Sequence, residues 1–348
     1  MITLTIITDW LMKYMSADAA FYTELVIVAA IYLAVFAIFG LFLVWMERRV
    51  AGFFQLRLGP NRVGPMGLLQ TIADALKLVT KELTGTKKAD SYLYRLAPYF
   101  VIVTALMSMA VLPFSAELQA FDINIGLFFI ASVSSVGVIG IFLAGWASNN
   151  KYSLIGGMRT GIQMISYELS VGMVIVTMAT LAGSLRMSEI VELQKDGWFI
   201  FSGHISAIIA FALFMIAGTA ESNRTPFDLV EAESELGAGF HTEYSGMNFA
   251  YYFLAEFINM FIISAVAVVI FFGGWLSPFG ITDSIPYMGV FWFMLKTLFI
   301  IFLMMWFRWT FPRLRIDQLL TLEWKYLIPI NMVNIVLMAL LVWLGLTF

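Results

Sequence analysis

Acidic residues are concentrated in one short segment, 221–243, which lies between two apolar stretches. Its six carboxylates and single arginine, Arg224, give a net charge of −5. Crowded carboxylates repel one another, so some must hold protons or pair with arginines elsewhere. Such coupled groups could store protons, and the alternative is a solvated acidic loop. The carboxylates are Glu221, Asp228, Glu231, Glu233, Glu235 and Glu243.

Three further ionisable residues, Glu168, Glu256 and Lys296, lie inside apolar stretches. Charge is costly in hydrocarbon, so such residues usually face a bundle interior or water and mark ion or proton pathways. The alternative is a side chain that reaches the interface from a helix end. Both glutamates lie on the order of 10 Å from the end of their stretch nearest the acidic segment. They would therefore extend its carboxylates inward, whereas Lys296 is expected nearer the middle of the membrane.

The segment 47–65 places four arginines around Phe53 and Phe54. These residues could hold a polar head group while the aromatic rings contact an apolar tail, and the alternative is an anchor for lipid phosphate. The glycines of this segment are not followed by Lys-Ser/Thr, so they do not form a phosphate-binding loop. No dinucleotide-binding glycine pattern occurs either, and nicotinamide binding is not expected.

Composition indicates what kind of protein carries these residues. Of 348 residues, 61% are hydrophobic and 12% are charged, with a mean hydropathy of +0.89. Soluble domains are about a quarter charged, so we expect an all-α integral membrane protein that binds no nucleic acid. Cysteine is absent, which excludes disulfides, thiolate iron–sulfur ligation, cysteine zinc sites and c-type haem attachment. We predict no metal site and no redox centre in this chain.

Eight stretches are long enough for membrane-crossing helices of about 20 residues. Together they would form a single membrane domain over 1–348, with structured cytoplasmic loops. The predicted spans are 25–45, 98–115, 127–147, 162–183, 204–220, 249–273, 288–307 and 327–346.

The distribution of basic residues predicts the orientation. Segments 46–97, 148–163, 221–248 and 308–326 contain 16 Lys and Arg, against 3 in the leader and the opposite loops. Basic loops stay in the cytoplasm, so both termini should face outward, most simply in the periplasm of a bacterial inner membrane.

One inner segment, 66–83, has helical periodicity with apolar residues on one face. Its charges are too many for a span, so we expect an amphipathic helix in the membrane interface. A helix packed under a soluble partner is the alternative, and both can hold at once.

Three motifs in these loops resemble the signatures of one family of respiratory complex I, the proton-pumping NADH:quinone oxidoreductase. It is the family of mitochondrial NADH dehydrogenase subunit 1 and the bacterial H subunit, and the similarity covers nearly the whole chain. The motifs are Gly52-x-x-Gln55-x-Arg57-x-Gly59-Pro60-Asn61-x-x-Gly64, then Pro226-Phe227-Asp228-Leu229-x-Glu231-x-Glu233-Ser234-Glu235 with Glu243-Tyr244-Ser245-Gly246, and Pro312-Arg313-x-Arg315-x-Asp317-Gln318.

The resemblance implies a subunit that contacts the peripheral redox arm and other membrane-arm subunits, forms the membrane side of the quinone chamber and couples quinone reduction to proton movement. Quinone would enter near the first span, the interfacial helix and the sixth span. NAD, FMN and iron–sulfur clusters would belong to partner subunits. The resemblance implies chamber residues Glu47, Arg48, Arg57, Arg62, Asp74 and Arg224, and a proton path of Glu168, Glu221, Asp228, Glu231, Glu233, Glu235 and Glu256.

Two other assignments compete with this one. Related subunits occur in membrane-bound hydrogenases. A stand-alone proton or cation transporter would also explain intramembrane carboxylates, but the chain has no clear internal repeat, and the long inner loops would have no purpose.

Overall fold

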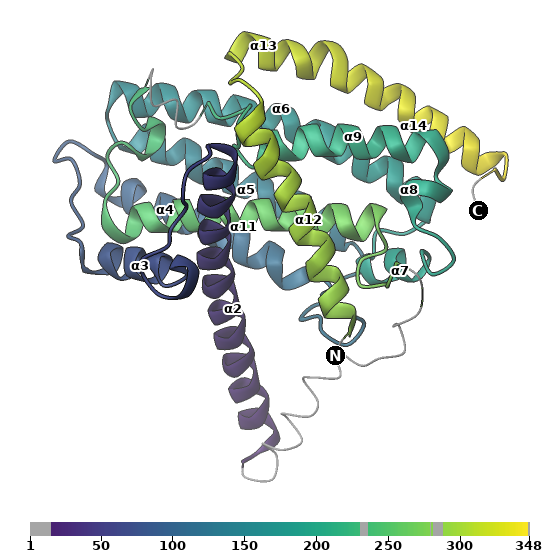
Figure 1. The fold of residues 1–348 in the computed structure, drawn as a ribbon, viewed down its shortest axis with the longest axis horizontal. Helices are drawn as coiled ribbons and strands as arrows, with labels where there is room; N and C mark the ends of the chain where they lie inside the picture. The colour runs from purple at the N-terminus through teal and green to yellow at the C-terminus, as the bar shows by residue number, and fades with distance from the viewer. Residues whose placement is uncertain (1–14, 230–235, 279, 281–287, 347–348) are drawn as a thin grey trace.

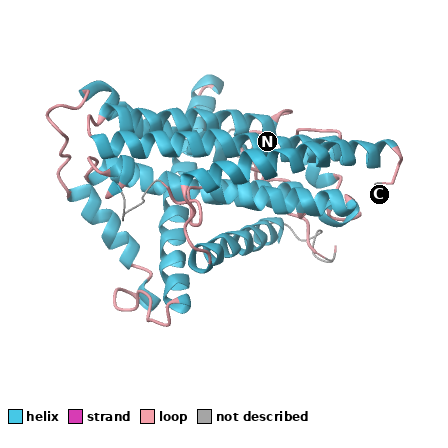
Figure 2. Cartoon of the chain, turned by 90° about the horizontal axis from the view of Figure 1, so that it is seen from above, coloured by secondary structure: helices cyan, strands magenta, loops and turns pink. Residues whose placement is uncertain are grey.

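The computed structural model describes residues 15–229, 236–278, 280 and 288–346. These residues form helices joined by loops, and no strand occurs among them (Figure 2). Eight of the described helices are long and apolar enough to cross a membrane, so the prediction of an all-α integral membrane protein is confirmed. They are α2 (Ala17–Phe54), α4 (Ser91–Val111), α5 (Gly126–Ala147), α6 (Lys151–Ala182), α9 (His204–Glu221), α11 (Gly246–Phe271), α12 (Met288–Thr310) and the continuous α13–η3–α14.

The shorter elements lie between these helices and at their ends. α13 (Ile316–Thr321), the π-helical turn η3 (Leu322–Leu327) and α14 (Ile328–Trp343) form the last crossing. α3 (Gln70–Thr80) lies beside α2 and α11. The remaining short helices are η1 (Pro65–Gly67), α7 (Met187–Glu192), α8 (Phe199–Ser202) and η2 (Gly239–His241).

α11 is the central helix of the bundle. Most of its positions from Ala255 to Phe271 are buried, and it contacts α2, α4, α9 and α12. In Figure 1, α2 and α12 run across the direction of α6, α9 and α14. The N-terminal half of α2 extends away from the other helices and exposes apolar side chains. Its backbone bonds are internal, so lipid or a neighbouring protein can cover it.

Close helix packing occurs at a small residue between α4 and α5. A Cβ at Gly140 of α5 would lie 2.7 Å from Val101 of α4 and 3.2 Å from the carbonyl of Ala97. The glycine therefore permits the close approach of the two helices. Gly172 of α6, by contrast, has no atom within 4 Å of such a Cβ, so it does not mark a close helix contact.

Several helices begin earlier than the predicted spans, and the difference is largest for α6 and the last crossing. α6 begins at Lys151, where the Asn150 side chain caps it by accepting from the backbone N–H of Tyr152 at 3.0 Å. The last crossing begins at Ile316. Most of 148–163 and 308–326 is therefore helical instead of loop, because a helix satisfies its own backbone bonds beyond its most apolar part. As a result, Glu323 lies on a helix and is buried.

The interfacial helix is shorter than the predicted 66–83. Its apolar residues Ile72, Leu76 and Val79 are more than a third exposed, which suits contact with lipid. Asp74 lies on the side of α3 that meets the bundle, together with the buried Thr71. The segments 55–90, 222–229 and 236–245 lie at one end of the bundle, and we call this the loop-rich end.

Candidate functional site

A buried ion cluster lies at the loop-rich end, centred on Glu47 of α2. Arg224 Nη1 lies 3.1 Å from Glu47 Oε2, and Arg308 of α12 pairs with Oε1 of the same carboxylate. Arg224 Nε lies 3.4 Å from Glu256 Oε1 of α11. We call Glu47, Arg224, Glu256 and Arg308 the Glu47 cluster. Its two positive and two negative groups balance, which is what makes charges tolerable at this depth.

Local backbone structure fixes Arg224 in this position. α9 ends at Glu221, and Asn223 adopts a left-handed conformation with φ +52° that asparagine tolerates well. The Arg224 N–H then donates to the Thr219 carbonyl at 3.2 Å. The turn directs the guanidinium into the bundle, where it lies 4.2 Å from the centre of the Phe257 ring. The side chain is thus held by charge and by an aromatic face.

A second ion pair joins the acidic segment to the chain that follows α12. Arg313 Nη2 lies 3.0 Å from Asp228 Oδ2, and Asp228 is buried. The backbone N–H of Leu314 also donates to the Pro226 carbonyl at 2.9 Å. This pair joins a carboxylate of the acidic segment to an arginine far along the chain, whereas Arg224 of the same segment pairs with Glu47 and Glu256 outside it.

An apolar cavity of about 350 Å³ lies between α2, α3 and α11. Small and apolar side chains such as Ala37, Ala250 and Leu254 form much of its wall. Its polar groups include an ion pair, in which Arg48 Nη1 lies 2.5 Å from Asp74 Oδ2. Because Arg48 follows Glu47 on α2, the cavity is adjacent to the Glu47 cluster. An apolar space with a few convergent polar groups is typical of a binding site for a small organic molecule.

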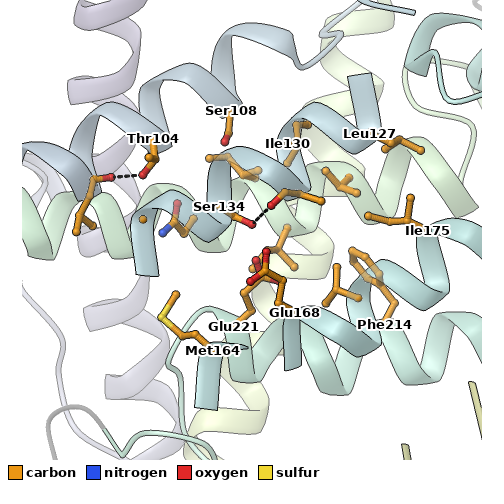
Figure 3. Close-up of a pocket in the computed structure, with 18 of the residues that line it drawn as sticks. Thr104, Ser108, Leu127, Ile130, Ser134, Met164, Glu168, Ile175, Phe214 and Glu221 are labelled. Atoms are coloured by element: carbon orange, nitrogen blue, oxygen red, sulfur yellow. Dashed lines mark hydrogen bonds between the residues drawn. The ribbon is translucent and has the colours of Figure 1, made fainter. Parts of the chain in front are cut away.

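Two small cavities, each with carboxylates in a largely apolar wall, continue from the cluster into the bundle. The first, of about 20 Å³, has Glu256 and Glu221 in its wall; the second, of about 50 Å³, has Glu221 and Glu168. Figure 3 shows the side chains of Glu168 and Glu221 next to each other in the second cavity, below Ser134. Asn259 lines both cavities. Each space exceeds the roughly 10–15 Å³ that one water needs, so water can connect the three carboxylates.

Glu168 and Glu221 differ from the cluster in their partners. Ser135 donates its hydroxyl to Glu168 Oε1, and Glu221 Oε2 is buried without a hydrogen-bond partner. Within the described residues, neither carboxylate forms an ion pair. Carboxylates that meet only hydroxyls and water can gain and lose protons more readily than carboxylates held by arginine.

His241 lines the first small cavity together with Tyr252. Burial lowers the pKa of His241 to about 3, so the ring is neutral at physiological pH. Aromatic rings of Phe240, Phe249 and Tyr252 surround it. Burial also raises the pKa of nearby Tyr244. The side chains of His241 and Tyr244 are therefore both neutral at physiological pH.

The structure brings some predicted site residues together and separates others. Arg57 and Arg62 are exposed and lie outside the lining of the apolar cavity. Glu231, Glu233 and Glu235 fall outside the described residues. Lys296 donates to the carbonyls of Phe272 and Leu276, at the end of α11 opposite to the loop-rich end, and not to a carboxylate of the Glu47 cluster.

Sequence reasoning missed three contributors. Arg308 was counted only among the basic residues that set the orientation, and its pairing depends on where α12 crosses α2. Asn259 is an amide in the apolar part of α11, and its position one turn after Glu256 is the signal that could have found it. Glu323 was assigned to a loop, although a carboxylate between Leu322 and Trp324 could have suggested burial.

Fold and site together define a polytopic membrane protein with a buried, charge-balanced cluster beside an apolar cavity. The profile of the NADH dehydrogenase family matches residues 27–339. The NADH-quinone oxidoreductase H subunit of Bacteroides fragilis (strain YCH46) is 54% identical over the full length of both chains. The corresponding H subunit of Brevibacillus brevis is 48% identical over 91% of this chain and 93% of its own. Subunit 8 of the NADH-quinone oxidoreductase of Rhodothermus marinus is 46% identical over 86% of this chain and 91% of its own length. The chain belongs to this family.

Proposed function

We propose that this chain forms the membrane side of the quinone chamber in NADH-quinone oxidoreductase and couples quinone reduction to proton translocation. The family makes it a membrane subunit of that complex. The observation that carries the finer proposal is the apolar cavity between α2, α3 and α11, which lies directly beside the Glu47 cluster. An isoprenoid tail suits the apolar wall, and the Arg48–Asp74 pair suits a polar head group.

The proton path begins where the cavity meets the cluster. A change of charge at the quinone head would act first on Arg48 and Glu47, because these residues are adjacent on α2. Glu47 shares Arg224 with Glu256, so a change at one carboxylate alters the electrostatic balance of the other. Glu256 faces Glu221 across the first small cavity, and Glu221 faces Glu168 across the second.

The loop-rich end is the proposed contact with the peripheral arm. Leu56 and Leu58 are 96% and 87% exposed, on either side of the exposed Arg57. Exposed leucines rimmed by charge suit a protein partner. This role accounts for Arg57, and for Arg62 in the same loop, better than a place in the chamber wall. The end would face the cytoplasm in a bacterial inner membrane, as the basic residues predict.

A pair of alanines on α2 tests the cavity. Ala37 lines it, whereas Ala30 lies two turns away on the same face and is exposed. Ala37→Trp should fill the cavity and lower quinone reduction, and should also reduce covalent labelling by a photoreactive quinone. Ala30→Trp should change neither. The assignment would be refuted if Ala37→Trp assembled fully and kept both labelling and activity.

A further inference from the structure

A carboxylate that the proposed path does not use is buried on another face of α6. Glu323 lies in the π-helical turn η3, and its side chain is fully buried. It meets Ser170 of α6, two residues beyond Glu168. Successive helical residues are about 100° apart, so Ser170 and Glu168 point to different sides of α6. Glu323 is thus separated from the Glu168–Glu221 cavity by the helix itself.

The contacts of Glu323 leave one of its oxygens without a partner. Ser170 donates its hydroxyl to Glu323 Oε1 at 2.5 Å, and Oε2 has no hydrogen-bond partner. No arginine, lysine or histidine pairs with this carboxylate in the described part of the chain. The titratable group facing it from α6 is Tyr167, which donates its hydroxyl to the Leu319 carbonyl instead. Lys325, on the same turn, is exposed.

Asn331 supplies the second observation. Its Nδ2 donates to the same Ser170 hydroxyl at 3.2 Å, while its buried Oδ1 lacks a partner. One turn later, Asn334 uses both ends of its amide, because Ser206 of α9 donates to Oδ1 at 2.8 Å and the Ser206 carbonyl accepts from Nδ2 at 3.1 Å. The two asparagines share a helix, but only the one beside Glu323 has an unpaired acceptor.

Glu323 and Asn331 both contact the Ser170 hydroxyl, and each has one buried acceptor oxygen, Oε2 and Oδ1, to which no group donates a hydrogen. A proton on Glu323 Oε2 supplies it and also removes a fully buried charge that no cation balances. A sodium ion would need about six oxygens at short range, more than the carboxyl, the amide and the hydroxyl provide. Buried π-helical turns are often found at functional positions, which agrees with a site at η3.

We propose that Glu323, Ser170 and Asn331 form a proton-binding site between α6 and the last crossing, distinct from the Glu168–Glu221 cavity. The carboxyl of Glu323 carries the proton at neutral pH. Ser170 donates to one carboxyl oxygen, and the amide oxygen of Asn331 is the acceptor available to the acid hydrogen. The site does not depend on the proposed quinone chamber.

Infrared difference spectroscopy on the intact, membrane-embedded complex tests the site. Subtracting the spectrum of Glu323→Gln from that of the natural protein at pH 7 should leave a carbonyl band of one protonated carboxyl that shifts in D₂O. Glu82→Gln is the matched control, since Glu82 is exposed and its ionised carboxylate gives no such band. Loss of carboxylate bands on Glu323→Gln, with no acid band, would overturn the proposal.

Two further variants keep the carboxyl and remain informative even if Glu323→Gln does not assemble. Asn331→Leu and Ser170→Ala each remove a hydrogen-bond partner of the acid, so the acid band should move to higher frequency. A spectrum unchanged by both variants would overturn the site. Spectra in sodium chloride and in choline chloride should agree, and an acid band present only without sodium would show a sodium site instead.

Discussion

The Glu47 cluster and the Glu168–Glu221 cavity both hold buried carboxylates, but the carboxylates have different kinds of partner in the two regions. In the cluster, Arg224 and Arg308 balance the charges of Glu47 and Glu256. In the cavity, the carboxylates meet hydroxyls and water-sized space. Buried carboxylates in one protein can therefore have different functions. The cluster holds fixed charges next to the proposed quinone chamber, while the cavity provides groups that can exchange protons.

Removing the central arginine should produce the largest effect. Arg224→Met would leave Glu47 and Glu256 buried with too little positive charge, at a cost of about 3–5 kcal/mol. We expect a large loss of assembled complex on native gels and a lower melting temperature. Arg224→Lys, which keeps the charge but not the planar donor fork, should fall between Met and the natural residue. Full assembly and unchanged melting of Arg224→Met would show that the cluster is not structural.

The cavity carboxylates should behave differently, because no cation would be left unpaired. Glu221→Gln and Glu168→Gln should assemble normally. Quinone reduction from NADH and proton pumping should fall together by about tenfold or more, as expected when a proton-transfer group is lost. Electron transfer from NADH to a soluble artificial acceptor should persist. Pumping is measured with a pH-sensitive dye in sealed vesicles.

Glu82→Gln is the control for these variants, because Glu82 is exposed at the loop-rich end. It should leave all three activities unchanged. Normal pumping in both cavity variants would remove the functional difference between the two regions.

His241 lies in the wall of the small cavity that joins the two regions. Its burial predicts that the stability of the folded protein falls at acidic pH. Burial lowers its pKa to about 3, whereas the unfolded ring titrates near about 6.5. The unfolded state therefore binds the proton first as the pH falls. The contribution of the neutral ring to stability is complete above about pH 6.5 and falls by about 1.4 kcal/mol for each pH unit below it.

His241→Asn removes this titration. The melting temperature of the complex should drop less between pH 7.5 and pH 5.5 in the variant than in the natural protein. An equal drop in both would show that the ring is not protonated on unfolding in this range.

The exposed Arg48–Asp74 pair at the cavity should give the smallest change in stability. Exposed pairs contribute at most about 1 kcal/mol, so Arg48→Met and Asp74→Asn should assemble. Each should raise KM for quinone several-fold more than it lowers kcat, if the pair holds the head group. A double-mutant cycle measures their coupling. Unchanged KM in both single variants would separate this ion pair from quinone binding.

Much of the fold followed from the sequence because apolar runs of about 20 residues dominate it. The ends of the helices were less predictable. Lys151 and Ile316 begin helices where charged residues and, near Ile316, a proline suggested loops, since backbone hydrogen bonding continues where apolarity stops. The carboxylates of the acidic segment were expected to hold protons or to pair with arginines elsewhere, and Asp228 pairs with Arg313, whose position near it only the fold determines.

The site was only partly predictable for the same reason. Glu168 and Glu256 stood out because charge is rare inside spans, and Glu47 and Arg224 were expected from the family resemblance. Arg308 and Glu323 had no comparable signal in the sequence, because the role of each depends on a contact with a residue far along the chain. Arg308 pairs with Glu47 across 261 positions, and Glu323 meets Ser170 across 153.

The sequence by itself determined that this protein crosses a membrane many times, carries no cysteine and places acidic and basic residues where lipid would not tolerate them singly. These properties follow from composition and local periodicity, which need no partner. Only the tertiary structure decided which charges neutralise one another, where the apolar cavity opens and which face of α6 each carboxylate occupies. Ion pairing and cavities arise between helices, and the crossing of α2, α11 and α12 sets them in a way that no single segment encodes.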